Sequence, residues 1–321
     1  GTLRVTGTAI ASLDSWTLNT GTFRGGIDVD DADHTLTLNA SLSGNGWLVK
    51  KGAGTLVIGA AGTLSGPVTN QAGTLRFGAS APWYPGAALQ LEGGAVDLGP
   101  NAAGMGSLSG GSGTITNAAG LAVTQAVSDA FSGEITGAGG FVKAGSGILV
   151  LAGQNTYSGL TVVNSGAGAL VLSNTTGQAL AGSLQIGSGG ANAFVRLEAD
   201  EQIADTAVVS FSSAGGTSYG RWLLLGHTET IGGLDDRYGQ GIVENSDNSG
   251  AFPNNDAAAG PATLILSNTT DYIFTGYLRN YGDLVSSPVN LIVRGTARQT
   301  LSNTRITYSG LTRIEAGELA L

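Results

Sequence analysis

The 321 residues include 54 glycines and no cysteine, and only 12% of them are charged. The 14 basic and 23 acidic residues give a net charge of −9, which argues against nucleic acid or an anionic membrane surface as a partner. No run of about 18 or more apolar residues is present, so direct membrane insertion is not expected. Without disulfides, the fold must depend on its core and on stacked strands.

Short apolar segments separated by glycine run through the whole chain and predict strands. Apolar residues stand two positions apart, the spacing that places side chains on one face of a strand, in 36–38, 56–58, 149–151 and 170–172. Helical spacing is scarce, and its best example is Glu198 to Asp205. Asn45-Gly46 is the only Asn-Gly pair, so hairpin signals are nearly missing and parallel pairing is favoured.

The densest acidic cluster comes first, at Asp28, Asp30, Asp31 and Asp33. Strand alternation places Asp28 and Asp30 on one face, and oxygen ligands at this spacing can hold Ca²⁺ weakly. However, the Gly-Gly-x-Gly-x-Asp nonapeptide of calcium-loaded rolls is absent from the sequence. We therefore interpret the cluster as an acidic exposed strand face and predict no metal site.

One phrase occurs at 46–77, is repeated at 140–172 and returns in part at 303–321. The first two copies share Lys-x-Gly-x-Gly-x-Leu, the last two share Tyr-Ser-Gly-Leu-Thr, and all three close on Ala-Gly-x-Leu followed by one residue and Leu or Phe. A chain that reuses one short unit stacks its copies, so that each copy buries the apolar face of its neighbour.

Stacked parallel strands with glycine corners predict an all-β fold, a parallel β-helix. Each strand pairs with its equivalent one coil later, at roughly twenty residues per coil. Glycine suits the corners because it tolerates positive φ and close backbone approach. Phosphate binding by Gly52-Ala53-Gly54 or Gly145-Ser146-Gly147 is disfavoured, since these glycines lead into strands and no Gly-Lys-Ser/Thr follows.

The strings Lys-x-Gly-x-Gly-x-Leu-x-Leu, Asn-Thr-Tyr-Ser-Gly-x-Thr and Ala-Gly-x-Leu-x-Leu resemble the passenger-associated transport repeat of bacterial autotransporters, the type V secretion proteins. The copy at 143–172 matches almost fully, and the copies that begin at Lys50 and Arg294 are degenerate. The resemblance implies a right-handed parallel β-helix displayed outside the cell, with repeats that aid export and folding. It implies no particular ligand.

Neither a signal peptide nor a terminal set of barrel strands is recognisable in the sequence. We therefore expect residues 1–321 to form a single β-solenoid passenger segment of a longer protein whose C-terminal translocator barrel lies elsewhere. The expected location is the bacterial cell surface, on the extracellular side of the outer membrane, or the medium after secretion.

Aromatic residues are the candidate ligand-binding groups. Trp83 and Tyr84 lie between Pro82 and Pro85, which favours a stiff loop whose rings can stack on a ligand. The alternative is that Trp83 packs back against the solenoid. Trp47 is aligned with Phe141 and is expected in the core, whereas Trp16 and Trp222 head strand-like segments and are expected to be partly buried.

Candidate catalytic residues are loosely arranged. Asp235-Asp236 with Arg237 follows Gly232-Gly233-Leu234, and a solvated turn is the preferred interpretation over a grafted active site. His34 and His227, the only histidines, are interpreted as exposed residues beside strand ends. We therefore expect no catalytic residues and no cofactor.

The longest interruption of the pattern lies near 244–261 and carries Asn245, Asp247, Asn248, Asn254, Asn255 and Asp256. The equivalent segment after Asn117 is only a few residues long, so this region reads as an insertion. Insertions in solenoids emerge as side loops, where binding evolves on rigid scaffolds, but mobility without function is equally compatible.

The preferred function is a structural stalk or adhesin module that binds a host or matrix protein, a glycan or a sister copy. One alternative is a polysaccharide lyase or hydrolase, which would gather acidic and basic residues from several successive coils into one concavity. Another is an export scaffold whose parent protein recognises its ligand elsewhere.

Overall fold

The computed structural model describes residues 1–15, 21–79, 83–84, 86–164, 166, 168–214, 216–236, 238–246, 260–280, 287–302 and 305–321. All regular secondary structure in these residues is β-strand. They form two compact units, the first comprising residues 1–141 and 155–159 and the second residues 142–154 and 160–321. The expectation of one continuous solenoid over 1–321 stays a prediction. The part of the chain that the structure describes contains no apolar helix of membrane-spanning length.

The strands of the first unit are β1 (Thr2–Val5), β2 (Arg24–Val29), β3 (Thr35–Leu38), β4 (Ser43–Gly44), β5 (Trp47–Lys51), β6 (Thr55–Ile58), β7 (Thr63–Leu64), β8 (Val68–Asn70), β9 (Thr74–Phe77), β10 (Ala88–Leu91), β11 (Ala95–Asp97), β12 (Ala103–Met105), β13 (Ser107–Ser109), β14 (Thr114–Thr116), β15 (Leu121–Thr124), β16 (Asp129–Phe131) and β17 (Glu134–Thr136).

From Phe141 onward the strands are β18 (Phe141–Ala144), β19 (Leu149–Leu151), β20 (Thr161–Val163), β21 (Ala169–Leu172), β22 (Leu184–Ile186), β23 (Ala193–Leu197), β24 (Val208–Phe211), β25 (Gly220–Leu223), β26 (Thr228–Ile231), β27 (Gly233–Asp236), β28 (Gly241–Glu244), β29 (Ala262–Leu266), β30 (Tyr272–Phe274), β31 (Tyr277–Arg279), β32 (Val289–Val293), β33 (Arg298–Leu301), β34 (Thr312–Ile314) and β35 (Glu318–Ala320).

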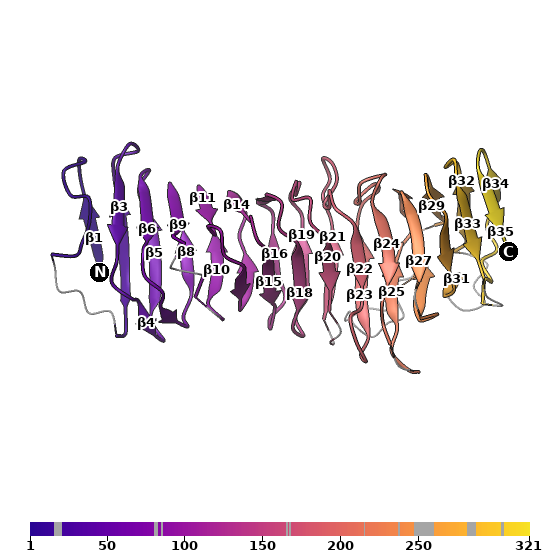
Figure 1. The fold of residues 1–321 in the computed structure, drawn as a ribbon, viewed down its shortest axis with the longest axis horizontal. Helices are drawn as coiled ribbons and strands as arrows, with labels where there is room; N and C mark the ends of the chain where they lie inside the picture. Colours follow the sequence, from indigo (N-terminus) through magenta and orange to yellow (C-terminus); the bar gives the residue numbers. More distant parts are fainter. Residues whose placement is uncertain are drawn as a thin grey trace. The chain divides into compact units, whose positions relative to one another are not determined.

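The first unit is built from parallel strands that pair with their equivalents one coil later. One sheet has the strand order β1-β2-β5-β8-β10-β13 and a second has the order β3-β6-β9-β11-β14-β17. In both sheets the strand numbers rise steadily from one edge to the other, so each strand pairs with the strand that the chain reaches one coil later (Figure 1). Leu36 pairs with Leu56, Leu56 with Leu75 and Leu75 with Val96, and all four side chains are fully buried. These apolar ladders confirm the predicted parallel β-helix.

The second unit repeats this arrangement with longer turns. Its sheets contain the orders β18-β20-β22-β24-β27, β19-β21-β23-β25-β28-β31, β26-β29-β32-β34 and β30-β33-β35. Leu149 pairs with Leu170, Leu170 with Val195 and Val195 with Trp222, again as a buried inward ladder. Leu56 and Leu149, which the repeat makes equivalent, therefore occupy equivalent ladder positions.

The lysine of the repeat motif has a structural role that the sequence did not reveal. The Lys50 side chain is fully buried, and its Nζ donates to the carbonyl oxygens of Lys51, Gly52 and Ala72 at 2.8–2.9 Å. Lys143 Nζ donates in the same way to Ala144 and Gly145. Burial lowers the pKa of each lysine to about 8.

The first glycine of the same motif forms the corner that these lysines hold. Gly52 has φ +75° and Gly145 has φ +78°, values that side chains with a Cβ rarely adopt. A Cβ at Gly52 would also approach the Val29 carbonyl oxygen to 2.2 Å. The prediction that glycine serves the corners is confirmed at these positions.

The expectation that Trp47 lies in the core is wrong, because its side chain is 37% exposed whereas Phe141 is fully buried. The motif lysines Lys50 and Lys143 fix the equivalence, so Leu48, not Trp47, corresponds to Phe141. A shift of one residue along a strand moves a side chain to the other face. Trp222 is fully buried rather than partly buried, and Trp16 lies outside the described residues.

The helical reading of Glu198 to Asp205 is also wrong. The segment forms an irregular corner between β23 and β24, and Glu201 has a positive φ of 51°. Hydrogen bonds to neighbouring coils, rather than helical ones, satisfy its backbone: the Glu201 N–H donates to the Thr228 carbonyl oxygen at 2.9 Å. This corner forms part of the hollow described next.

Candidate functional site

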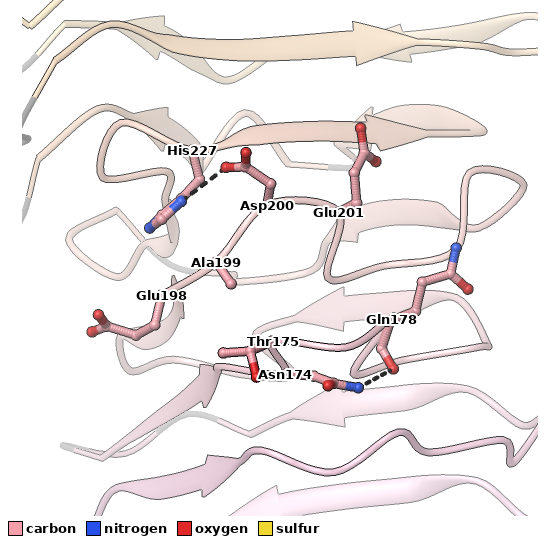
Figure 2. Close-up of a pocket in the computed structure, with 9 residues that line it drawn as sticks. Asn174, Thr175, Gln178, Glu198, Ala199, Asp200, Glu201 and His227 are labelled. Carbon is pink, nitrogen blue, oxygen red and sulfur yellow. Dashed lines mark hydrogen bonds and ion pairs between the residues drawn. The ribbon is translucent and has the colours of Figure 1, made fainter.

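The second unit contains a surface hollow of about 610 Å³ at this corner. Three of its nine lining residues are acidic, and the lining consists of Asn174, Thr175, Gly177, Gln178, Glu198, Ala199, Asp200, Glu201 and His227. Three successive coils contribute, since these residues follow β21, follow β23 and precede β26. Figure 2 shows Asp200 and His227 pointing toward one another across the upper rim.

The Asp200 carboxylate holds two coils together at this rim. Its Oδ1 accepts the Thr228 N–H at 3.0 Å and lies 3.0 Å from His227 Nδ1. The Thr228 hydrogen bond is the main reason that the pKa of Asp200 falls below its ordinary value, with a further contribution from His227. Asp200 therefore remains ionised while it is engaged in the fold.

The other two carboxylates of the hollow are engaged as well. Glu201 accepts the N–H of Thr230 at 3.1 Å and the hydroxyl of Thr230 at 3.0 Å. Glu198 Oε1 lies 2.6 Å from Arg196 Nε in an ion pair. All three acidic groups of the lining thus have partners within the corner.

A buried polar stack supports the hollow from inside. Gln202 accepts the Asn174 N–H at 2.7 Å and donates to the Asn174 carbonyl oxygen at 2.8 Å. Glu229 accepts the N–H groups of Gln202 and Ile203 at 2.8 and 2.9 Å. Burial raises the pKa of Glu229 to about 8, against the opposing effect of these hydrogen bonds.

The arrangement suits a polar ligand better than acid–base catalysis. Glu229 has the raised pKa of a general acid, but it is fully buried and both of its oxygens already accept backbone N–H groups. Glu198, Asp200 and Glu201 come from one coil, and His227 on the next coil is the one histidine of the lining. The hollow therefore offers hydrogen-bonding edges, negative charge and a partly exposed imidazole.

The predicted acidic face at Asp28 and Asp30 is occupied by an arginine. Arg4 Nη2 lies 2.7 Å from Asp30 Oδ1, and Arg4 Nε lies 3.6 Å from Asp28 Oδ2. Both aspartates therefore share one face of the first unit, as strand alternation predicted. Within the described residues, no group of three or more histidine, aspartate or glutamate side chains is arranged to hold a metal ion.

Trp83 and Tyr84 lie in the interior of the first unit, with exposures of 1% and 0%. Their rings pack on Phe77 at centroid distances of 5.1 and 5.5 Å. Burial raises the pKa of Tyr84 above its ordinary value. Neither ring presents an exposed face, so packing against the core, the alternative stated above, describes this pair. Their ligand role stays a prediction.

Two interpretations of exposed residues are corrected. His34 is buried with 3% exposure, although His227 is partly exposed at the hollow. Asp236 is also buried, and its carboxylate accepts the N–H groups of Tyr238, Gly239 and Gly241 at 2.8–3.0 Å. The buried carboxylate therefore stabilises the turn that follows it, and burial raises the pKa of Asp236. Arg237 lies outside the described residues.

Only the ends of the predicted side loop near 244–261 are described. Glu244 and Asn245 are fully buried, and Asn245 Nδ2 donates to the carbonyl oxygens of Gly260 and Pro288 at 2.8 and 3.1 Å. Asp247, Asn248, Asn254, Asn255 and Asp256 lie outside the described residues. The two interpretations of the loop, binding and mobility without function, therefore both stay open.

Comparison with known proteins places these features in a family. The model of the passenger-associated-transport-repeat matches residues 48–77, 141–167 and 291–321, the three regions in which the sequence repeats its motif. The chain is an autotransporter passenger segment. The buried lysines Lys50 and Lys143 thus belong to the first two repeats of this segment.

A curated relative is similar along most of this passenger segment. The adhesin BmaC autotransporter of Brucella suis biovar 1 (strain 1330) is 31% identical over 299 residues, which cover 89% of this chain. The chain spans only 8% of the length of that relative. No solved structure gave a significant match to the chain.

Proposed function

We propose that this passenger segment is a surface-displayed or secreted stalk with an adhesive role. The observation that carries the proposal is the ladder of in-register parallel strands, repeated coil after coil with motif lysines and glycines at the corners. Stacked coils bury their own apolar faces and present side chains outward at a regular spacing of about 4.8 Å. The similarity to a protein named as an adhesin supports the same role.

The partner is proposed to be a host or matrix protein, a glycan or a second copy of the chain. The parent protein is proposed to carry a C-terminal translocator barrel, as the family implies. We propose that the segment is not an enzyme, because Asp200 and Glu201 bind the next coil, Glu198 is paired with Arg196, and Glu229 beneath the hollow is buried.

Display on cells tests the adhesive role. Residues 1–321 are fused to a translocator barrel in a non-adherent strain, and attachment to matrix proteins, to glycans and to sister cells is counted. The control strain displays the barrel without the segment, and antibody labelling equalises display. We expect attachment only with the segment. Equal display with attachment no higher than in the control would contradict adhesion and favour an export scaffold.

A further inference from the structure

The first unit exposes a tryptophan on the outward face of a regular sheet. Trp47 opens β5, and its side chain is 37% exposed, whereas the next residue, Leu48, is fully buried. Arg24 is the register partner of Trp47 on β2, but its guanidinium donates to Asn45 Oδ1 at 3.3 Å. Among the described residues, no aromatic ring or cation packs against the indole of Trp47, so its exposed part can accept a ligand.

A row of outward side chains, one from each successive coil, runs beside Trp47. Val49 of β5 pairs with Thr69 of β8, Thr69 with Gln90 of β10, and Gln90 with Ser109 of β13. Along each strand these residues alternate with buried ones, which places them on the outer face. Three strand spacings separate Val49 from Ser109, about 14 Å. We define the Trp47 face as Trp47, Val49, Thr69, Gln90, Ser107 and Ser109.

The polar groups of the Trp47 face are available for hydrogen bonds. Thr69, Ser107 and Ser109 are partly exposed, and within the described part of the chain their hydroxyls bond to no other group of the protein. The Gln90 amide nitrogen donates to Glu92 at 3.1 Å, which leaves the Gln90 carbonyl oxygen to accept. The face therefore offers uncharged donors and acceptors beside one flat aromatic ring.

The charges that adjoin this face are of both signs. Asp28 of β2 pairs in register with Lys51 of β5, and Arg4 Nε lies 3.6 Å from Asp28 Oδ2. No local excess of positive charge offsets the net charge of −9 that the whole chain carries. Nucleic acid and sulfated or uronate-rich polysaccharides are therefore repelled alike, and an uncharged ligand is favoured.

A neutral sugar chain matches this combination. Each sugar ring has a C–H face that packs on an aromatic ring, and a rim of hydroxyl groups that donate and accept hydrogen bonds. We propose that the Trp47 face binds a neutral polysaccharide laid along the stack of coils, with one sugar ring on Trp47 and the following ones over the polar row. The coils repeat at about 4.8 Å, so successive sugar units meet successive strands.

A protein partner fits this face less well, because a stable protein interface buries about 800 Å² on each partner around an apolar centre. The Trp47 face has a single large apolar side chain among hydroxyl groups. The proposal deepens the adhesive function and depends on it only for biological meaning. Binding by the purified chain is measured without display on cells, which allows either idea to fail alone.

The test uses the purified 321-residue chain and immobilised polysaccharides. Galactomannan, xyloglucan, β-glucan and dextran are neutral, and dextran sulfate adds sulfate to the dextran backbone. We expect saturable binding to at least one neutral polysaccharide, with less than about 2-fold change between about 0.05 and 0.5 M salt, because no charge attraction is screened. Absence of binding to all four neutral polysaccharides, or binding to dextran sulfate alone, would overturn the proposal.

Matched variants locate the binding to this face. Trp47→Ala should weaken it about 10-fold or more, and Trp47→Phe, which keeps a smaller ring, about 2- to 3-fold. Ser109→Ala removes one hydroxyl of the polar row and should weaken binding about 2- to 5-fold. The control, Val127→Ala, shortens an exposed apolar side chain outside the sheet that contains β5. Equal losses in Trp47→Ala and Val127→Ala, or full binding by Trp47→Ala, would refute the assignment.

Discussion

The two units use one motif at different coil lengths. In the first unit, Leu36, Leu56, Leu75 and Val96 follow one another at intervals of 20, 19 and 21 residues. In the second unit, Leu149 pairs with Leu170 after 21 residues, but the next two intervals on this ladder are 25 and 27 residues. Short coils therefore give a regular stack of strands, and longer coils add turns that form the hollow.

Burial changes along with coil length. Strands of the first unit, such as β6 and β9, bury alternate side chains and leave the others partly or fully exposed. In the second unit, all four residues of β21 and of β28 are buried. The second unit also encloses the carboxylates of Glu244 and Glu229. Its free energy of unfolding should therefore depend on ion pairs and on pH more strongly than that of the first unit.

The largest expected effect comes from the buried ion pairs of the second unit. Glu244→Ala leaves Arg221 and Arg279 without their shared carboxylate, so it should lower the free energy of unfolding by about 3–5 kcal/mol. The matched change in the first unit is Arg76→Ala, which breaks the surface ion pair with Asp97 and should cost about 0–1 kcal/mol. Urea denaturation measures both, and equal losses would contradict the difference drawn between the units.

The motif lysines should matter in both units. Lys50→Ala leaves three corner carbonyl groups without their donor and opens a cavity, so we expect a loss of about 2–4 kcal/mol. The neighbouring Lys51→Ala, of equal charge, should change stability by about 0.5 kcal/mol or less. Lys143→Ala tests the same corner in the second unit. A Lys51 variant as unstable as the Lys50 variant would refute this role.

The same lysines predict a dependence on alkaline pH. Their pKa is about 8 in the folded chain and 10.5 when exposed, so the unfolded chain binds more protons between these values. Stability should therefore rise from pH 8 toward pH 10.5 through their contribution. Denaturation of the Lys50→Ala variant over this range should show a shallower rise than the natural chain, and an unchanged slope would count against burial of the charge.

Glu229 predicts an opposite trend at lower pH. Its pKa is about 8 in the folded chain and 4.5 when exposed, so the folded chain binds more protons between these values and loses stability as pH rises. The slope reaches about 1.4 kcal/mol per pH unit for one proton. Glu229→Gln should flatten it, at a cost of about 1–3 kcal/mol because an amide nitrogen cannot accept the second N–H.

The matched control for Glu229 is Asn155 of the first unit, a neutral amide that also accepts a backbone N–H. Asn155 accepts the Ile135 N–H at 2.9 Å and carries no charge. Asn155→Ala should lower stability about equally at pH 5 and pH 8. If the Glu229→Gln variant kept the same slope of unfolding free energy against pH as the natural chain, the titrating group would be another residue.

The smallest effect tests strand register in the first unit. Trp47→Ala removes an exposed side chain and should change stability by about 0.5–1 kcal/mol, whereas Leu48→Ala at the buried neighbouring position should cost about 2–5 kcal/mol. Thermal denaturation separates these values. If the Trp47 variant lost as much stability as the Leu48 variant, Trp47 would be a core residue and the inward face of β5 would be the opposite one.

Sequence patterning predicted the repeating part of the fold because ladders follow directly from apolar periodicity. Leu36, Leu56 and Leu149 were correctly placed by alternation alone. Trp47 was misplaced because the interval from glycine to lysine is one residue longer in its copy, and lysine rather than glycine sets the register. The lysine itself was missed, since a cation is rarely fully buried and nothing local reveals the carbonyl groups around it.

The sequence pattern could not predict the hollow or the buried acidic residues, for a different reason. Asp200, Glu201 and Glu229 gain their environment from coils about 27–29 residues away. Local spacing at Glu198 to Asp205 instead imitated a helix. His34 and Asp236 were similarly judged by their polarity, although both are buried and the N–H groups of a turn bind the Asp236 carboxylate.

Engineered disulfides test the stacking of coils most directly, because the natural chain has no cysteine. Val57 and Arg76 are register partners on adjacent strands, and Asp97 stands one strand further on. Adjacent parallel strands lie about 4.8 Å apart, within reach of a disulfide, whereas two spacings are not. Mild oxidation should join Val57→Cys with Arg76→Cys within one chain and leave Val57→Cys with Asp97→Cys reduced. Equal cross-linking of both pairs, or of the second pair alone, would contradict the parallel in-register solenoid.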